Sequence, residues 1–361
     1  MNSKNSFIAE LIESSAGAYA SYAAQLLLER RPEAAERFGT DPFAGWRDHL
    51  RGRLYELAAS IETDEPRIFA NRVAWTRQAF EARGVPIEDV REALGCLREV
   101  LEEELPERNR IDLSAYFEPA EEALEGFPMD GVTPLRADTP GGRIAAEYLL
   151  AVLEGDRHRA SRVVLDAIPD RITVEQAYRE VLVPAEIELG RMWHLNELTV
   201  GEELFATSVT EMVIAQLYAL IDRKPWNGKV LLASPTETNR HGIGIRIISD
   251  FFEMEGWRVI LLDQPLPGLE FAQTCKTFKA DVVALSASMS VHLRSAMHLI
   301  QAVRSEPGLE HVKVLVGGMA FMDSDDLWQR VGADGYASSP ETALATAARF
   351  AGLAHPHAAV S

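Results

Sequence analysis

The stretch "KVLLASPTETNRHGIGIRIISDFFEMEGW", residues 229–257, decides the fold. Its apolar run "KVLLAS" is followed by a polar turn that carries His241, and then by a segment whose apolar residues recur at helical spacing. This pattern indicates a buried β-strand, a loop and an amphipathic helix. Taken alone, the pattern leaves three roles open for His241: a metal ligand, a base, or an ordinary surface histidine.

The same pattern repeats to the end of the chain. Four further apolar runs, "RVILL", "VVALSAS", "VKVLVGG" and "GYAS", alternate with stretches of helical period. Continuous apolar strands separated by helices are typical of a parallel sheet covered on both faces. We therefore expect a Rossmann-like, five-stranded parallel α/β domain over residues 225–361.

Three loops at one edge of this sheet carry distinctive residues. His241 lies in the first βα loop, Ser286 and Ser288 close the third strand, and Gly317 and Gly318 close the fourth. Ligands of such folds bind at the carboxyl ends of the strands. An imidazole, two small hydroxyls and a glycine pair suit a bulky planar cofactor whose metal needs a nitrogen ligand. The first βα turn has no P-loop and no G-x-G-x-x-G fingerprint.

Two helical segments precede the sheet pattern. Residues 143–224 contain four predicted helices, and residues 1–126 carry apolar side chains at helical spacing throughout. Between them, residues 127–142 are rich in Pro and Gly, which predicts a linker. The expected fold class is α + α/β multidomain, with a globin-like helical domain, a four-helix segment and the α/β domain.

Composition excludes several classes of protein. The net charge of −19 argues against a nucleic-acid surface, which needs clustered Lys and Arg. No apolar run approaches the roughly 20 residues of a membrane span, and no signal peptide is evident. Cys96 and Cys275 are the only cysteines, so we expect no disulfide framework and a reducing cytoplasm.

The motifs "NRHGIG", "SASMS" and "VGGMAF" resemble the cobalamin-binding module of methionine synthase, the corrinoid methyltransferase subunits and the B12 photoreceptors. The resemblance covers about residues 229–351. It implies that His241 is the lower cobalt ligand and that Gly244 is the glycine of the family motif. Asn239 stands where the family has a carboxylate, so it can orient the imidazole but adds no charge.

The same resemblance assigns the other two loops. It implies that Ser286 and Ser288 lie beside the buried nucleotide tail of cobalamin, and that Gly317 and Gly318 are the family's glycine pair.

The four-helix segment resembles the cap that covers the upper face of cobalamin. Trp193 and Glu203 have the spacing with which the CarH-type photoreceptors hold an adenosyl group, although Leu204 stands where they have histidine. His194 resembles their second cobalt ligand, which binds after light breaks the cobalt–carbon bond. The alternatives are a core tryptophan at Trp193 and a solvated turn histidine at His194.

A helical domain ahead of such a cap resembles the photocobilins, which pair cobalamin with a bilin. This implies biliverdin as a second, non-covalent cofactor in residues 1–126. The alternative is that the aromatic side chains form core and the arginines are solvated. The aromatic candidates are Tyr22, Phe43, Trp46, Tyr55, Phe69, Trp75 and Phe80, and the candidates for binding propionates are Arg51, Arg53, Arg72 and Arg77.

These resemblances lead to the expectation of a light-sensing signalling protein, not an enzyme, that uses adenosylcobalamin and forms a light-dependent homo-oligomer with an unknown signalling partner. The alternative is a corrinoid methyl carrier of a methyltransferase system, which Leu204 favours. A passive cobalamin-binding module is the third possibility. We expect no nucleic acid or membrane partner.

Overall fold

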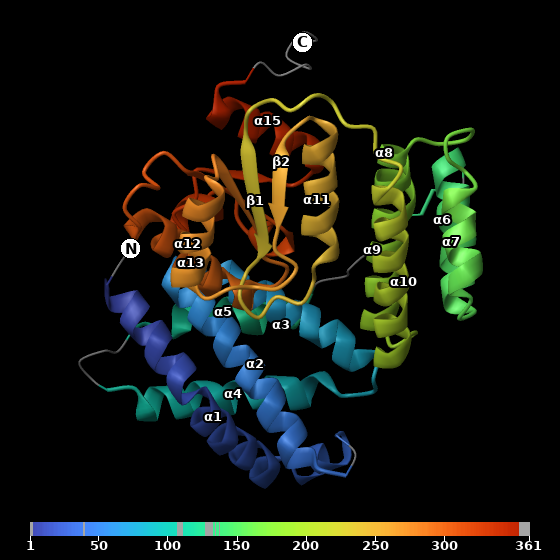
Figure 1. Cartoon of the computed structure of the whole chain (residues 1–361). Helices are drawn as coiled ribbons and strands as arrows, with labels where there is room; N and C mark the ends of the chain where they lie inside the picture. Colours follow the sequence, from blue (N-terminus) through green and yellow to red (C-terminus); the bar gives the residue numbers. More distant parts are fainter. Residues whose placement is uncertain are drawn as a thin grey trace. The chain divides into compact units, whose positions relative to one another are not determined.

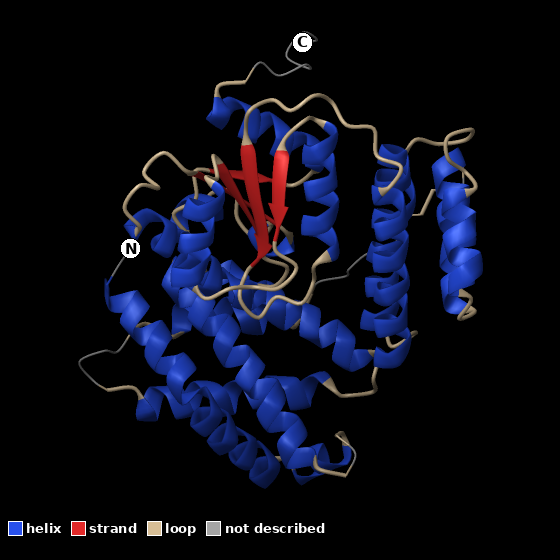
Figure 2. Cartoon of the chain, viewed as in Figure 1, coloured by secondary structure: helices blue, strands red, loops and turns tan. Residues whose placement is uncertain are grey.

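The computed structural model describes residues 3–38, 40–106, 111–126, 133, 135–136 and 138–353. The chain forms two compact units. The first contains Met1–Met129 together with Ala287–Ile300 and Met319–Ala333, and the second contains Asp130–Ser286, Gln301–Gly318 and Asp334–Ser361. Helices and strands are drawn in separate colours in Figure 2.

The five-stranded parallel sheet is confirmed. Its strands are ordered β2-β1-β3-β4-β5, and every neighbouring pair is parallel. All six residues of β1 are buried, which explains its uninterrupted apolar sequence. The strands are β1 (Val230–Pro235), β2 (Arg258–Leu261), β3 (Val282–Ser286), β4 (Lys313–Gly317) and β5 (Gly335–Ala337).

Helices follow the strands as expected (Figure 1). Phe252 of the first of them packs in the sheet core with Leu231 and Val282. Ser339 begins the last helix with a capping box to Thr342. The helices are α11 (Ile243–Met254), α12 (Gly268–Phe278), α13 (Leu293–Ser305), α14 (Leu327–Arg330) and α15 (Pro340–Ala351).

The four-helix segment before the sheet also forms. It consists of α6 (Pro140–Leu153), α7 (Arg157–Leu165), a long helix and α10 (Val200–Tyr218). The long helix starts as α8 (Val174–Gln176), continues through a π-helical turn (Ala177–Leu182) and ends as α9 (Val183–His194). Thr173 and Thr199 begin helices with capping boxes. We call α6 to α10 the cap.

Every regular element described in the N-terminal segment is a helix, which confirms the helical expectation. We call its helices the bundle. Helix α1 packs against α2 and α4, and α3 packs against α5. No described helix is long and apolar enough to cross a membrane. The bundle helices are α1 (Ser3–Arg30), α2 (Pro42–Thr63), α3 (Pro66–Glu81), α4 (Ile87–Glu104) and α5 (Ser114–Ala123), with a 3-10 turn at Pro32–Glu36.

The domain boundaries drawn from the sequence stay a prediction. Much of the expected linker, 127–132 with 134 and 137, lies outside the described residues, and α6 begins at Pro140. Both cysteines are buried and free, in α4 and α12.

Candidate functional site

The strand order creates a switch point between β1 and β3. The chain leaves β1 toward β2 on one side, whereas β3 pairs with β1 on the other. Ligands of open parallel sheets bind where the strand order reverses in this way. The register brings Pro235, Ser286, Gly317 and Ala337 into one row across four strands. The loops after β1 and β4 therefore leave the sheet at the level where β3 ends.

Asn239 connects the first of these loops to β3. Its side chain is only 2% exposed, and its Nδ2 donates a hydrogen bond to the carbonyl oxygen of Ser286 at 2.9 Å. The backbone N–H of Thr236 donates to the same oxygen at 3.0 Å. Thr238 adopts a left-handed φ of 65°, which is an unfavourable conformation for a β-branched residue. The loop is thus held at the switch point by hydrogen bonds.

The same amide orients the predicted cobalt ligand. His241 is exposed, and the Oδ1 of Asn239 accepts from its backbone N–H at 3.1 Å and lies 3.1 Å from its Nδ1. Because Nδ2 of Asn239 already donates to Ser286, Oδ1 is the acceptor, and Nδ1 of His241 carries the proton. This tautomer leaves the lone pair on Nε2, the atom that can bind a metal.

Two of the predicted glycines meet a structural requirement. A Cβ on Gly317 would lie 2.8 Å from the carbonyl oxygen of Ala337, and Gly318 has a φ of 101°. Gly244, in the first turn of α11, is different, because a Cβ there would meet no protein atom within 4 Å. Protein packing does not explain a glycine at 244, whereas the close approach of a large ligand would.

The two predicted serines are both half-buried, and they fall in different compact units. Ser286 is the last residue of β3, and Ser288 follows it by two residues. Ser288 belongs to the unit that contains the bundle.

The cap carries the other predicted residues. Trp193 is half-buried in the last turn of α9 and packs against the cap core. His194 ends α9 and is 2% exposed, so it is not a solvated turn residue. Glu203 lies on α10, where its Oε1 accepts a hydrogen bond from Thr207 Oγ1 at 3.2 Å. Leu204, beside it, is 59% exposed.

A buried pair, which no pattern in the sequence predicts, joins the cap to the sheet domain. Tyr178, in the π-helical turn, donates its hydroxyl to Oδ2 of Asp250 in α11. Burial raises the pKa of Asp250 to about 6. Residues 72 apart with no shared motif could be paired only once the helices were placed.

The candidates for a bilin site do not share one environment. Trp46 and Phe69 are fully buried in the bundle core, where Trp46 donates to the carbonyl oxygen of Ala34 at 3.0 Å. Tyr22 and Phe43 are exposed. Arg53 is buried and pairs with Glu56 at 2.7 Å.

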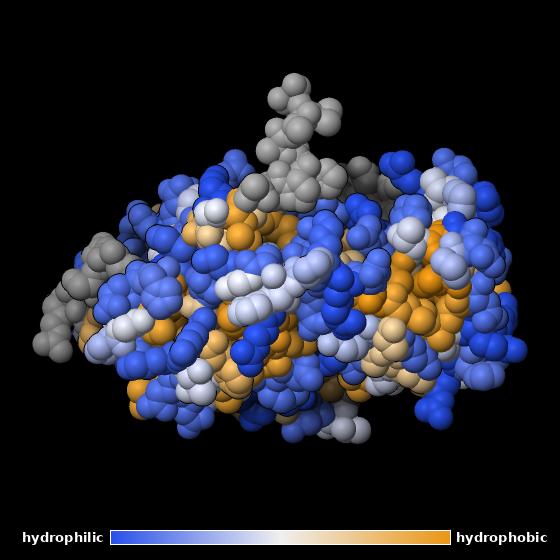
Figure 3. Space-filling model, turned by 45° about the horizontal axis from the view of Figure 1, so that its top comes forward, coloured by the Kyte–Doolittle hydropathy of each residue, from blue (hydrophilic) through white to orange (hydrophobic). Residues whose placement is uncertain are grey.

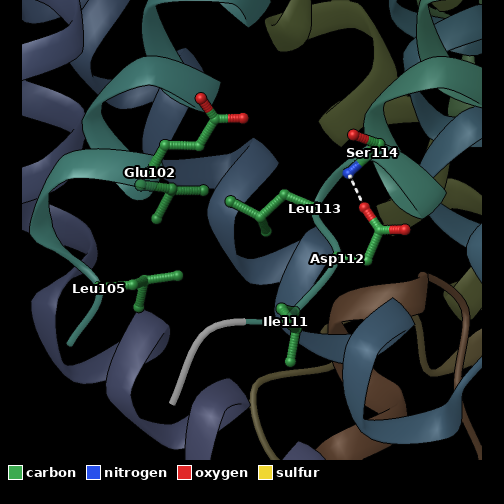
Figure 4. Close-up of a pocket in the computed structure, with 7 residues that line it drawn as sticks. Glu102, Leu105, Ile111, Asp112, Leu113 and Ser114 are labelled. Atoms are coloured by element: carbon green, nitrogen blue, oxygen red, sulfur yellow. Dashed lines mark hydrogen bonds between the residues drawn. The ribbon is translucent and has the colours of Figure 1, made fainter. Parts of the chain in front are cut away.

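A pocket of the bundle lies between the end of α4 and the start of α5 (Figure 4). Its charged lining residues, Glu102 and Asp112, are acidic, and Oδ1 of Asp112 accepts from the backbone N–H of Ser114 at 3.1 Å. Carboxylates in the lining would repel the propionates of a bilin.

The residues at the sheet edge fit a corrinoid. They offer an oriented imidazole, an open position at Gly244 and a glycine backbone at the end of β4. Fold and site together define a cobalamin-binding protein. Two family models, each described as a B12 binding domain, match residues 229–345 and 144–218. Neither model reaches residues 1–143.

Similar proteins narrow the family to which the chain belongs. Dimethylamine corrinoid protein 1 of Methanosarcina acetivorans is 31% identical over 187 residues, which cover 48% of this chain and 86% of that protein. Dimethylamine corrinoid protein 2 of the same organism is 27% identical over 204 residues, covering 52% and 92%. The monomethylamine corrinoid protein of Methanosarcina barkeri shares the fold, with a TM-score of 0.51, 16% identity and coverage of 58% and 97%. The chain belongs to the family of B12-binding corrinoid proteins.

The expectation of a light sensor is wrong. The relatives are named as corrinoid proteins of methylated amines, which matches the alternative of a corrinoid methyl carrier. The light-dependent homo-oligomer is overturned with it. The expectation that the chain is not itself an enzyme agrees with these names.

Proposed function

We propose that this chain binds cobalamin and carries a methyl group between two methyltransferases. The Asn239–His241 pair beside Ser286, where a buried amide orients an exposed imidazole, is the observation that carries cobalamin binding, and the names of the relatives support the carrier role. His241 would be the lower cobalt ligand. A bound cobalamin would supply a cobalt atom able to carry a methyl group, which one partner would deliver from its substrate and the other would pass to an acceptor molecule. The chain itself would hold and orient the cofactor, and its partners would catalyse both transfers.

The loops after β3 and β4 would receive the nucleotide tail. Ser286 and Ser288 offer small hydroxyls, and Gly317 and Gly318 let the backbone approach a large group. Gly244 would leave room for the corrin beside His241, since a side chain at 244 would occupy open space there.

The cap offers the apolar surface that a methyl carrier needs. Figure 3 shows hydrophobic side chains gathered over the cap helices, on the right of that view. Exposed apolar side chains on α9 and α10 include Val183, Ile187, Val200 and Leu204. Apolar groups exclude water from a reactive centre, whereas an adenosyl group needs polar partners for its hydroxyls. Leu204 in place of a histidine therefore favours the methyl group.

An adenosyl group stays a prediction that rests on Trp193 and Glu203. A comparison of methylcobalamin with adenosylcobalamin, each titrated into the apoprotein in the dark, separates the two cofactor forms. We expect methylcobalamin to bind at least as tightly as adenosylcobalamin. The proposal of a methyl carrier would be overturned if the protein bound adenosylcobalamin about tenfold or more tightly than methylcobalamin, about 1.4 kcal/mol, and if Trp193→Ala abolished that preference.

The lower ligand is tested with His241→Ala. This variant should either fail to bind methylcobalamin or bind it with the benzimidazole of the cofactor still on the cobalt. The absorption spectrum distinguishes both outcomes from the parent protein, in which His241 would be the ligand. His158→Ala, an exposed histidine on α7, is the control and should match the parent. A His241→Ala spectrum and affinity equal to the parent's would remove His241 as the ligand.

Binding of biliverdin by the bundle also stays a prediction. Its support is that Nε of Arg53 and Nε of Arg72 are buried atoms without a hydrogen-bond partner, and such donors suit carboxylates. Biliverdin added to the full chain should then change its absorption spectrum, and Arg53→Met should prevent the change. An unchanged spectrum in the parent would end this prediction.

A further inference from the structure

The bundle holds two segments that lie more than 150 residues further along the chain. Residues Ala287–Ile300 and Met319–Ala333 form one compact unit with Met1–Met129. The first segment begins directly after β3, and the second begins two residues after β4. They are therefore the continuations of the two loops that carry Ser286, Ser288, Gly317 and Gly318.

Arg294 anchors the first segment. Its side chain is 8% exposed, and its guanidinium forms ion pairs with Glu62 of α2 and Glu13 of α1. Glu62 is also buried, so the charges of both side chains are withdrawn from water. Such a pair is strongly sensitive to the loss of one partner, because the other charge is left buried and uncompensated. Arg294 lies six residues after Ser288, at the start of α13.

The second segment is anchored twice. The side chain of Asp323 is 8% exposed, accepts a hydrogen bond from Nδ2 of Asn71 at 2.9 Å, and lies 3.7 Å from the guanidinium of Arg72. Arg330 donates to the carbonyl oxygens of Thr63 and Asp64, at 3.1 and 2.6 Å. These two carbonyls close the carboxyl end of α2, where a cation also interacts favourably with the helix dipole.

Both anchors converge on the end of α2 and the start of α3. Glu62, Thr63 and Asp64 are consecutive, and Asn71 follows in the next helix. A change at this corner of the bundle would shift both held segments together. Displacing either segment would leave buried charges without their partners, so these contacts oppose such a displacement.

We propose that the bundle is a positioning element for the tail-binding loops, with Arg294 and Asp323 as its positioning residues. This inference rests on the proposed function, because it concerns how the same corrinoid is held. By fixing the chain just beyond Ser288 and Gly318, the bundle sets the separation of the two loops that would receive the nucleotide tail. The affinity for the tail and the state of the bundle are then coupled, and coupling of binding energies is reciprocal.

The test uses two corrinoids that differ in the tail. Aquocobalamin carries the nucleotide tail and diaquocobinamide lacks it, and each is titrated into the full chain by absorption. In Glu62→Gln we expect the affinity for aquocobalamin to fall by about tenfold, while the affinity for diaquocobinamide stays within about twofold of the parent's. Asp323→Asn should show the same selectivity. Glu13→Gln, which alters the more exposed partner of Arg294, is the milder variant if Glu62→Gln does not fold.

Asp89→Asn is the matched control. Asp89 is fully buried in the bundle, and its ion pairs are with Arg31 and Arg37 of the bundle itself. It should lower the stability of the bundle and leave the aquocobalamin affinity unchanged. The positioning role would be overturned if Glu62→Gln lowered the affinities for aquocobalamin and diaquocobinamide equally. It would also be overturned if Asp89→Asn lowered the aquocobalamin affinity as much as Glu62→Gln does. A parent chain that binds neither corrinoid would instead overturn the proposed function.

Discussion

Tyr178 donates a hydrogen bond to Oδ2 of Asp250 at 2.5 Å, between the π-helical turn of the cap and the helix that follows His241. Both side chains are buried. π-Helical turns are frequent at functional sites. The pair therefore ties the cap to α11, which begins two residues after His241.

Tyr178→Phe removes the donor and leaves the carboxyl group of Asp250 buried without it. We expect the free energy of unfolding to fall by about 1–3 kcal/mol, the cost of an unsatisfied buried polar group. Chemical denaturation measures it. Tyr218→Phe is the control, since the exposed Tyr218 of α10 donates its hydroxyl to Glu253, which lies on α11 like Asp250, at 3.2 Å. The loss of this hydroxyl should lower the free energy of unfolding by less than about 0.5 kcal/mol. Equal losses in the two variants would show that burial of the Tyr178–Asp250 pair adds nothing.

Asp250 should also give the stability of the protein a pH dependence. Burial raises its pKa from 3.8 to about 6, so the folded protein binds a proton more tightly than the unfolded chain does. The contribution of this group to stability is full below pH 4 and is lost as the pH rises through about 6. The rise in pKa corresponds to about 3 kcal/mol at most, as an order of magnitude.

Asp250→Asn isolates this contribution, because Asn keeps an acceptor for Tyr178 and does not titrate. Relative to the parent, the variant should gain stability between pH 4 and pH 7. Urea unfolding of both proteins at several pH values measures the difference. A difference that does not change with pH would mean that Asp250 has an ordinary pKa in the folded state.

Gly317→Ala tests the close approach at the end of β4. The new methyl group would lie 2.8 Å from the carbonyl oxygen of Ala337, so β4 and β5 must separate slightly. We expect a loss of about 1–3 kcal/mol in unfolding free energy and weaker cobalamin binding. Gly190→Ala, in α9, meets no atom within 4 Å and should instead stabilise the fold by about 0.5–1 kcal/mol. A Gly317→Ala protein as stable as the parent would contradict the steric argument.

Much of the fold was predictable because its signals are local. The central strands β1, β3 and β4 are largely buried apolar runs, since both faces of a parallel sheet are covered. The cap helices begin at residues with side-chain oxygens, as Thr173 and Thr199 do. The residues at the sheet edge followed from the same reasoning, because βα loops of a parallel sheet share one edge.

The remaining features depend on contacts that local patterns do not encode. The order of the strands decides that Asn239 reaches Ser286, and periodicity is silent on strand order. Arg294 and Glu62 are 232 residues apart. Aromatic residues at helical spacing have the same pattern whether they line a pocket or fill a core, and in the bundle Trp46 and Phe69 fill the core.

The last prediction concerns Asn239, whose side chain both holds the loop to β3 and orients His241. Its Nδ2 donates to Ser286, and its Oδ1 accepts from the backbone and the side chain of His241. Asn239→Ala removes the hydrogen bonds that hold the loop to Ser286 and orient the imidazole of His241. The loss of an outer hydrogen-bond partner of a metal ligand typically lowers metal affinity by about 10–100-fold, so we expect weaker binding of methylcobalamin. Asn239→Asp restores the family's carboxylate but places an anionic oxygen against the Ser286 carbonyl, 2.9 Å from Nδ2 in the parent. We therefore expect Asn239→Asp to lower the unfolding free energy by about 1–3 kcal/mol and yet to keep His241 on the cobalt, whereas Asn239→Ala loses affinity most. Denaturation and methylcobalamin titration, run on both variants, measure the two effects separately. If Asn239→Ala binds methylcobalamin as the parent does, the amide has no part in orienting the ligand, and the site's central geometric argument fails.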